Sequence, residues 1–524
     1  MGRQRQIVVG LHLTTLLLLA LHLYVRTLPS TPTPIPDPTD AEAAWWGLWP
    51  VTYAPGWAVR LGAVLIGGWI VGWWVMEVGR RSEPITAQHI IGLHLPHVPR
   101  NTQHLILGFA AVLLFCAFYA FPLVHTRWGD AYLLTKAIAW PDPALRLTHS
   151  WQAPLDVFLH SQLWLYLHEA MGWEDAMPLY RLLSPLAGLF YLMAALGVAR
   201  EQQAPVWLTF GLVTSLGVLQ LFFGYVENYS FAAAALLLYL WLGLRTLAGR
   251  TPLWITATVL AITHALHPST IILAPSLLYC GWQHVRCATN QQMRGNKFGA
   301  RYVLFKGLSP ELSTRLSTAL IIALPMAVVA LVVVFLMEAG GHGLAALVSS
   351  DRPGGGDARL FVPLWTTTTR WEHYTMFSWL HLRDFVNEQL LVAPVVLPGL
   401  VVLWFAKGIQ KGNRRQAMNR DMGEVQTVHR PSSIVHRQLS FIQIAALCYL
   451  FFIWVWNADY GGQRDWDLFS LAAIPAALWL AVTLPGCLSN RRYLQAGTIP
   501  LLMLQWLHLA AWIYQNTLPW EWPS

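Results

Sequence analysis

Charge is scarce in this sequence of 524 residues: Asp, Glu, Lys and Arg make up 11% of it, whereas apolar residues make up 55%. A soluble chain of this length needs far more charge to cover its surface, so the composition predicts a membrane protein with several spans. The formal net charge of +8 is scattered over short loops. This distribution gives no support to a nucleic-acid partner and is typical of positive charge retained on the cytoplasmic side for topology.

Cysteine is also scarce. There are five, and our topology places none of them in an external loop: Cys116, Cys280, Cys287, Cys448 and Cys487. That placement predicts no extracytoplasmic disulfide. Their spacing differs from that of metal ligands, so we expect them to pack as small hydrophobic residues.

Long apolar runs are abundant instead, and each has the length that crosses a bilayer. They lie at 7–25, 57–77, 104–122, 177–198, 206–223, 229–247, 318–337, 388–406, 439–456, 468–486 and 494–513, with a shorter pair between 252 and 282. The sequence therefore predicts an all-α polytopic fold of about 13 transmembrane helices. This count places the amino terminus inside and the carboxyl terminus outside.

Four regions follow from these runs. Residues 1–103 contain an anchor helix, a Pro-rich external tether and the second span, and residues 104–337 form a core that includes the large external loop 123–176. Residues 338–387 form a second external loop, and residues 388–524 contain the C-terminal spans. The second loop holds a Gly-rich stretch that fits either a mobile lid or a plain connector.

Two stretches of the first external loop, 130–140 and 155–173, have apolar residues at helical spacing but are too polar to cross. We expect them to be amphipathic helices on the membrane surface. The basic segments 283–317 and 407–438 indicate the cytoplasmic side. Acids gather in the outer loops, which topology does not explain. We therefore expect a protein of the bacterial cytoplasmic membrane with its functional face outside.

Polar residues recur where the outer loops meet the spans, and we expect them to line one hollow. They are Arg127, Asp130, His149 and Asp156 in the first loop, Glu227 in a tight connection, His264 and His267 at a break, and Arg464, Asp465 and Asp467 between two late spans.

Each of the acids has a structural and a functional interpretation. Glu227 lies at an apolar boundary, so it must pair with a cation, coordinate a ligand or remain protonated; a salt bridge or a helix cap would satisfy it equally. Asp130 opens a predicted helix, where a carboxylate either caps the helix or accepts a proton from a hydroxyl group. Arg127 nearby would keep it ionised.

The later cluster has the same ambiguity. Arg464 suits a phosphate clamp because of its forked guanidinium, or it is neutralised by Asp465 and Asp467, which also suit a helix amino terminus. His264 and His267 are about one turn apart, a geometry open to metal ligation. They are equally typical of interfacial histidines with satisfied hydrogen bonds, or of His267 binding a phosphate.

A multi-span protein whose first large external loop opens with an acid, here in Arg127-Trp-Gly-Asp130-Ala-Tyr, and carries two surface helices resembles the GT-C glycosyltransferases. The family's seven-span module would run from about residue 104 to 337. The resemblance implies transfer of a sugar from a polyprenyl-phosphate donor in the membrane lipid to an extracytoplasmic acceptor, with inversion. Asp130 would be the base, and Glu227 would orient the acceptor or a cation.

The same resemblance implies that Arg464, Arg127 and His267 neutralise the donor phosphate. Where a divalent cation takes part, Asp130 and Glu227 would be its ligands. Two other functions remain open from the sequence: a transporter or flippase of a polar or lipid-linked solute, and a noncatalytic membrane subunit. The sequence is silent on the oligomeric state.

Overall fold

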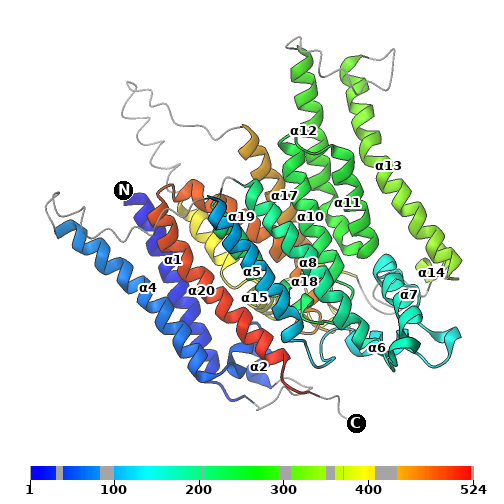
Figure 1. Cartoon of the computed structure of the whole chain (residues 1–524), viewed down its shortest axis with the longest axis horizontal. Helices are drawn as coiled ribbons and strands as arrows, with labels where there is room; N and C mark the ends of the chain where they lie inside the picture. Colours follow the sequence, from blue (N-terminus) through cyan, green and yellow to red (C-terminus); the bar gives the residue numbers. More distant parts are fainter. Residues whose placement is uncertain are drawn as a thin grey trace.

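The computed structural model describes residues 2–30, 39–82, 100–202, 204–293, 309–349, 360–369, 371–406, 433–458 and 460–520. Within these ranges the chain is helical, without a strand, and has one isolated bridge between Phe361 and Trp456. Figure 1 shows the long helices running side by side, with the two chain ends at opposite ends of the bundle.

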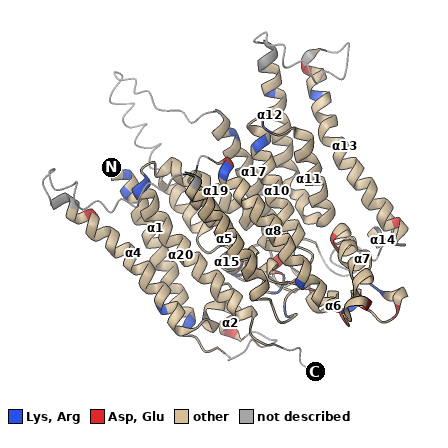
Figure 2. Ribbon diagram, viewed as in Figure 1, with Lys and Arg blue, Asp and Glu red and all other residues tan. Residues whose placement is uncertain are grey.

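Nine helices in the described ranges are long and apolar enough to cross a membrane, or ten if one bent pair counts as a span. They are α1 (Gly2–Arg26), α4 (Gly56–Ser82), α5 (Arg100–Ala120), α8 (Met177–Glu201), α10 (Ser230–Leu247), α13 (Pro310–Ala339), α17 (Ser433–Val455), α18 (Trp466–Ser470) continued by α19 (Ala473–Cys487), and α20 (Arg491–Asn516). Charged side chains gather at the helix ends and leave a charge-poor band between (Figure 2). The predicted all-α, membrane-spanning fold is confirmed at this level.

The predicted number of about 13 spans is not confirmed, and residues 206–223 account for one difference. They form a nine-residue helix, α9 (Val206–Thr214), followed by the 3-10 segment η3 (Gly217–Phe222). The hydroxyls of Thr214 and Ser215 donate to helix carbonyls four residues earlier, at 2.8 and 2.6 Å. Such bonds compete with the helical ladder. All of η3 is buried, as irregular backbone at membrane depth must be.

The predicted pair of spans between 252 and 282 accounts for two further differences from the predicted count. It consists of α11 (Leu253–Leu266), which has 14 residues, the 3-10 segment η4 (Pro268–Leu273) and α12 (Ala274–Met293), which is more polar than a span. The break falls at His267 because Pro268 cannot donate a backbone hydrogen bond and disfavours helix in the residue before it.

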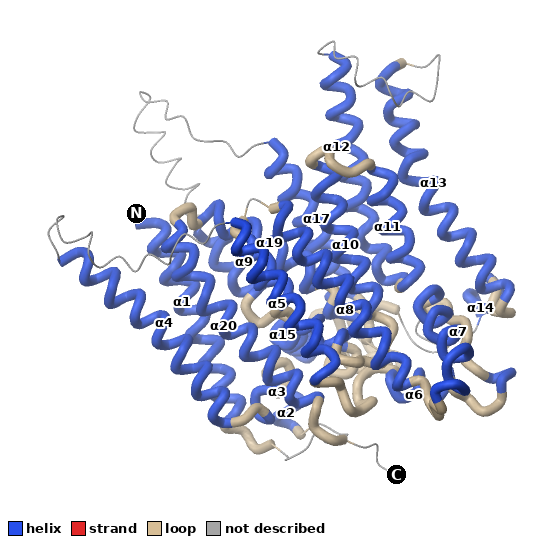
Figure 3. The backbone as a smooth tube through the Cα atoms, viewed as in Figure 1, coloured by secondary structure: helices blue, strands red, loops and turns tan. Residues whose placement is uncertain are grey.

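The predicted span 388–406 is the bent pair. Its first half, α15 (Trp379–Val392), meets the helix Val396–Ala406 at 101°. Pro394 lies in the break and removes a helical hydrogen bond there. The bend carries α15 beneath the other helices, at the end of the bundle that carries most of the loops (Figure 3).

Burial separates a central layer from a peripheral one. In the most apolar window of α18–α19, 78% of the residues are buried, whereas only 6% are buried in that of α13. Helix α13 stands at the edge of the bundle, against α11 and α12 (Figure 1). Since α13 is also the most apolar span, its free surface is suited to lipid.

The N-terminal helices pack into the bundle. Helices α1 and α4 contact α20, and the short helices α2 (Asp40–Trp45) and α3 (Pro50–Tyr53) join them. The side chain of Asn387 in α15 accepts from Gly47 N at 3.0 Å and donates to Ala44 O at 3.0 Å. This region, expected to be an addition to the core, therefore contacts both ends of the C-terminal region.

The first external loop contains both helices that its periodicity predicts. They are α6 (Ala131–Ile138) and α7 (Pro154–Met171), with the 3-10 turn η2 (Pro143–Leu145) between them. Helix α7 begins with a proline and ends at Gly172, which has φ +66°; both residues are favoured at these positions. The second loop contains α14 (Leu344–Ser349), but its Gly-rich stretch, and with it the expected lid, lies outside the described residues.

Candidate functional site

Two cavities open at the end of the bundle that carries α6 and α7. The first cavity has a volume of about 540 Å³. Its polar side chains include Asp130, Glu227, Asn228, Tyr229, His267, Tyr460 and Asp465. Its apolar wall is formed by Ile271, Ile272, Leu360, Phe361, Phe451, Phe452, Val455, Trp456 and Leu468. The cavity thus joins a carboxylate-rich end to an apolar flank.

Asp130 occupies the amino-terminal cap position of α6 but makes no capping hydrogen bond through its side chain. Its carboxylate accepts a hydrogen bond from Tyr460 instead. Burial raises the pKa of Asp130 above 3.8, while Tyr460 and the Arg464 charge lower it. The capping interpretation therefore fails for Asp130, and its carboxylate faces the first cavity.

Glu227 is buried, with 4% of its surface exposed. Its Oε1 accepts from the backbone N–H of Asp130, and its Oε2 accepts from the N–H of Asn228 at 3.3 Å. Burial, followed by the charges of Asp467 and Asp130, raises the pKa of Glu227 well above 4.5. Glu227, for which a cation, a ligand, a cap or protonation was open from the sequence, is bound by backbone donors, and it contacts the backbone of Asp130.

Asp467 and Glu227 both lie close to Gly129, at the position where a side chain would begin. Gly129 has φ +51°, and a Cβ there would collide with Glu227 Oε1 and lie 3.1 Å from Asp467 Oδ2. Asp467 accepts hydrogen bonds from Tyr225 Oη at 2.9 Å and from Leu468 N at 2.8 Å. Only glycine fits between these two carboxyl groups in this conformation.

Tyr460 forms a wall shared by both cavities. Asp465 Oδ2 accepts from the backbone N–H of Tyr460 at 2.8 Å and makes no capping bond to α18. The guanidinium of Arg464 lies over the Tyr460 ring, 5.0 Å from its centroid. Arg464 lines the second cavity, yet its charge reaches Asp130.

The two histidines at the break after α11 have different hydrogen-bond partners. His264 Nδ1 is 2.8 Å from Thr270 Oγ1, and His267 Nδ1 is 2.8 Å from Ser269 Oγ. Only His267 lines the first cavity. Burial lowers the pKa of His267 to about 3, so at neutral pH it offers hydrogen bonds but no positive charge.

The second cavity, about 380 Å³, contains Arg127. Arg127 Nη2 lies 2.9 Å from Glu42 Oε1, and both side chains are buried. Gln463 Nε2 donates to the same Glu42 oxygen at 2.9 Å. The structure therefore takes Arg127 away from the first cavity and pairs it with an acid between the first two spans.

Two further expected residues line neither cavity. Asp156 pairs with His160 one turn later in α7, at 3.1 Å. Burial lowers the pKa of His160, but the charge of Asp156 and its side-chain and backbone hydrogen bonds together outweigh burial, so the net shift is upward. His149 is 2.9 Å from Thr148 Oγ1 and stacks on His342 of the second loop. Both hold α7 and its surroundings together.

A metal site does not assemble in the part of the chain that is described: no three His, Cys, Asp or Glu side chains there are grouped to hold an ion. Asp130 and Glu227 were the expected ligands. Glu227 uses both oxygens on backbone N–H groups, which leaves it poorly suited to a cation. The residues present do not fit this expectation, and no reaction step is derived through a metal.

Sequence reasoning missed most of the second cavity. The segments that seemed to be tether and outer loop supply Trp46, Arg383 and Asp384 to its lining and Glu42 as the partner of Arg127. The available signal was Glu42, an acid in the short connection between the first two spans that could pair with the expected site residue Arg127. Their pairing spans 85 positions, which no local pattern reveals.

Comparison of the chain with models of protein families, with curated proteins and with solved structures gives no match in any of the three. The geometry of the two cavities therefore carries the functional argument.

Proposed function

We propose that the protein is an integral membrane glycosyltransferase that takes a sugar from a polyprenyl-phosphate donor and uses the first cavity as its reaction site. The observation that carries the proposal is the pairing, in one cavity, of an apolar flank with a carboxylate held by its neighbours. Asp130 forms the reactive end, and Glu227 holds its backbone.

The apolar flank suits an isoprenoid chain. Ile271, Phe361 and Phe451 line the cavity and are also exposed, at 66%, 59% and 61%. Ile271 belongs to η4, Phe361 to the second external loop, and Phe451 to α17. A wall that continues onto the apolar surface lets a lipid chain enter sideways while its polar head remains with the carboxylates.

In the proposed reaction, an acceptor hydroxyl attacks the anomeric carbon from the side opposite the phosphate. The new C–O bond forms as the bond to the phosphate oxygen breaks, and polyprenyl phosphate leaves with the electron pair. Asp130 takes the hydroxyl proton. Its pKa, raised by burial, makes it a stronger base than an exposed aspartate. Attack from this side inverts the anomeric centre.

The remaining residues position the groups. Glu227 holds the backbone of Asp130, and Tyr460 hydrogen-bonds its carboxylate. Arg464 remains the candidate for the departing phosphate, since its charge reaches Asp130 from across Tyr460. His267 contributes neutral hydrogen bonds.

A second candidate function is a transporter or flippase of a lipid-linked solute. Interrupted helices favour it: α9 stops at Thr214, α11 stops at His267, and the bent pair turns by 101°. Discontinuous helices of this kind form the binding sites of many transporters. Against it, the carboxylates of the first cavity lie at one end of the bundle and not at its middle.

The deciding experiment measures sugar transfer from polyprenyl-phosphate-linked sugars in purified membranes, with Asp130→Asn beside the parent chain. Loss of the base lowers transfer about 10²- to 10⁴-fold. Asp142→Asn is the matched control, because Asp142 is exposed in the same loop and caps η2, a role that asparagine preserves.

Full transfer by Asp130→Asn removes Asp130 from the reaction. Movement of a labelled lipid-linked sugar across proteoliposome membranes, without transfer, establishes the flippase instead.

A further inference from the structure

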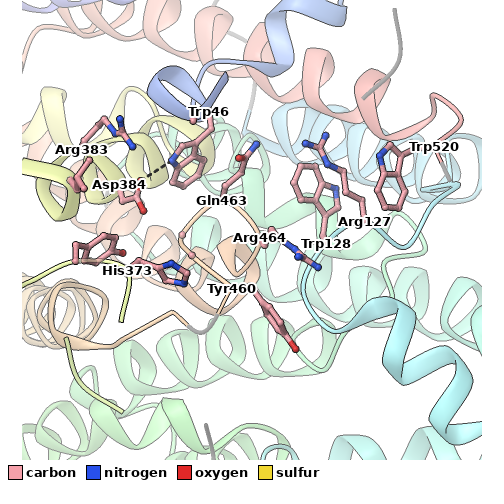
Figure 4. A pocket seen from close by; sticks show the side chains of 15 residues that line it. Trp46, Arg127, Trp128, His373, Arg383, Asp384, Tyr460, Gln463, Arg464 and Trp520 are labelled. Carbon is pink, nitrogen blue, oxygen red and sulfur yellow. Dashed lines mark hydrogen bonds between the residues drawn. The ribbon is translucent and has the colours of Figure 1, made fainter. Parts of the chain in front are cut away.

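The second cavity has a chemistry of its own. Its lining contains three guanidinium groups, from Arg127, Arg383 and Arg464, and a single carboxylate, from Asp384. Figure 4 shows these groups around one hollow, with Trp46 and Trp128 beside them. The Trp46 indole donates to Asp384 Oδ1 at 3.2 Å. Tyr374, His373 and Trp520 complete the aromatic lining.

Two of the guanidinium groups carry buried N–H donors that find no hydrogen-bond acceptor among the described residues. They are Nη1 of Arg127 and Nε of Arg383. Arg127 has 4% of its surface exposed, and its other terminal nitrogen is used by Glu42. A buried charged donor without an acceptor is costly, and both donors belong to residues that line the same cavity. Guanidinium groups with unused donors at a cavity wall suit an oxyanion ligand.

We propose that the second cavity binds a small anion through its guanidinium groups, with Arg383 as one contact and a ring face against the aromatic wall that includes Trp46. Arginine binds carboxylate or phosphate oxygens through two parallel N–H groups. Indole rings supply flat apolar surface for a ring at low entropic cost. The volume of about 380 Å³ limits the ligand to a single small molecule or headgroup.

Contrast with the first cavity strengthens the assignment. The second cavity presents guanidinium groups on its side of Tyr460, and these attract an anion. The second cavity also has little aliphatic wall, because Leu380 and Ala43 are its aliphatic members. A soluble anion therefore fits it better than a lipid chain. A lipid headgroup has the same oxyanion chemistry, so the test separates the two sources.

The experiment uses the full chain in phosphatidylcholine nanodiscs and measures thermal unfolding against sodium phosphate and sodium glucuronate, with sodium chloride at matched ionic strength. Neutral glucose is the uncharged comparison. Both anions raise the Tm of the parent chain and glucose does not. Arg383→Gln weakens the apparent affinity about tenfold or more, because a charge-assisted hydrogen bond is lost. Arg60→Gln, an exposed arginine of α4 outside both cavities, behaves as the parent.

A second arm adds phosphatidylglycerol to the nanodiscs. Stabilisation that requires this lipid and is lost in Arg383→Gln identifies a headgroup as the anion. The proposal is overturned if Arg383→Gln responds as the parent does, if glucose stabilises as much as the anions, or if neither arm shifts the Tm. Because the readout is binding, it stands whether or not sugar transfer is found.

Discussion

The two cavities lie on either side of Tyr460 and differ in nearly every respect. The first is larger, carries carboxylates and has an apolar wall that reaches the surface. The second is smaller, carries guanidinium groups and is walled by aromatic rings. The first is built from the middle of the chain and α17, whereas the second brings α2 and α15 to the loop that follows α5.

This difference shows how one end of a helical bundle separates charges of opposite sign over a short distance. The Thr126–Asp130 segment supplies a residue to each side: Arg127 turns toward Glu42, and Asp130 turns toward Tyr460. The turn between them depends on the positive φ of Gly129. Mutations on either side should therefore have separable effects.

The largest effect is expected from Gly129→Ala. The added Cβ collides with Glu227 and forces the Asp130 loop to move. A displacement of about 1 Å at a reacting group costs roughly 100-fold in rate, so sugar transfer should fall at least that far. Gly172→Ala has the same left-handed strain at φ +66°, but nothing lies within 4 Å of its Cβ. It should lose stability and keep its transfer rate; equal rates for the two variants would contradict the expectation.

The second cavity is tested by Glu42→Ala. The change leaves the buried Arg127 charge without its partner, which should cost about 3–5 kcal/mol of unfolding free energy. Glu311→Ala breaks an exposed pair with Arg315 and should cost about 0.5 kcal/mol or less. Denaturant unfolding of the two purified variants measures the contrast. Similar losses would show that Glu42 and Arg127 do not form a desolvated pair.

The smallest effect is expected from a change at Tyr460, which lines both cavities. It is a shift in the pH dependence of kcat/KM. Tyr460 hydrogen-bonds Asp130 and lowers its pKa, against the rise caused by burial. Tyr460→Phe should therefore raise the pKa of Asp130. In the proposed reaction Asp130 acts in its ionised form, so the acid limb of kcat/KM should move to higher pH. Tyr166→Phe, an exposed tyrosine on α7, should leave the limb in place. If Tyr460→Phe leaves the acid limb in place, that limb does not report the titration of Asp130.

Much of the fold follows from local sequence. In the described part of the chain, charge-poor runs of spanning length occur at nine helices and at the bent pair, because a bilayer imposes that length and composition. The meeting of Asp130, Glu227 and Asp465 follows from topology, since each lies in a connection on the same predicted face. Their hydrogen-bond partners do not follow, because Glu227 binds the backbone of Asp130 and not a cation.

Two features had no signal strong enough in the sequence. Residues 206–223 are as apolar as any span, and their interruption depends on Thr214 and Ser215 bonding backward within a crowded core. The pairing of Arg127 with Glu42 depends on α2 docking against α15, which rests on Asn387 and Trp46. Both are tertiary effects that periodicity does not encode.

The segment formed by α9 and η3 has a consequence for how the protein is assembled. Its six-residue 3-10 segment is buried on all sides, and lipid cannot satisfy its free carbonyl and amide groups. This segment cannot enter the bilayer alone in the conformation that it has in the bundle. It must be shielded by α8, α19 and α20, two of which are translated some 250 residues later, so the centre of the bundle closes only after the end of the chain has been made.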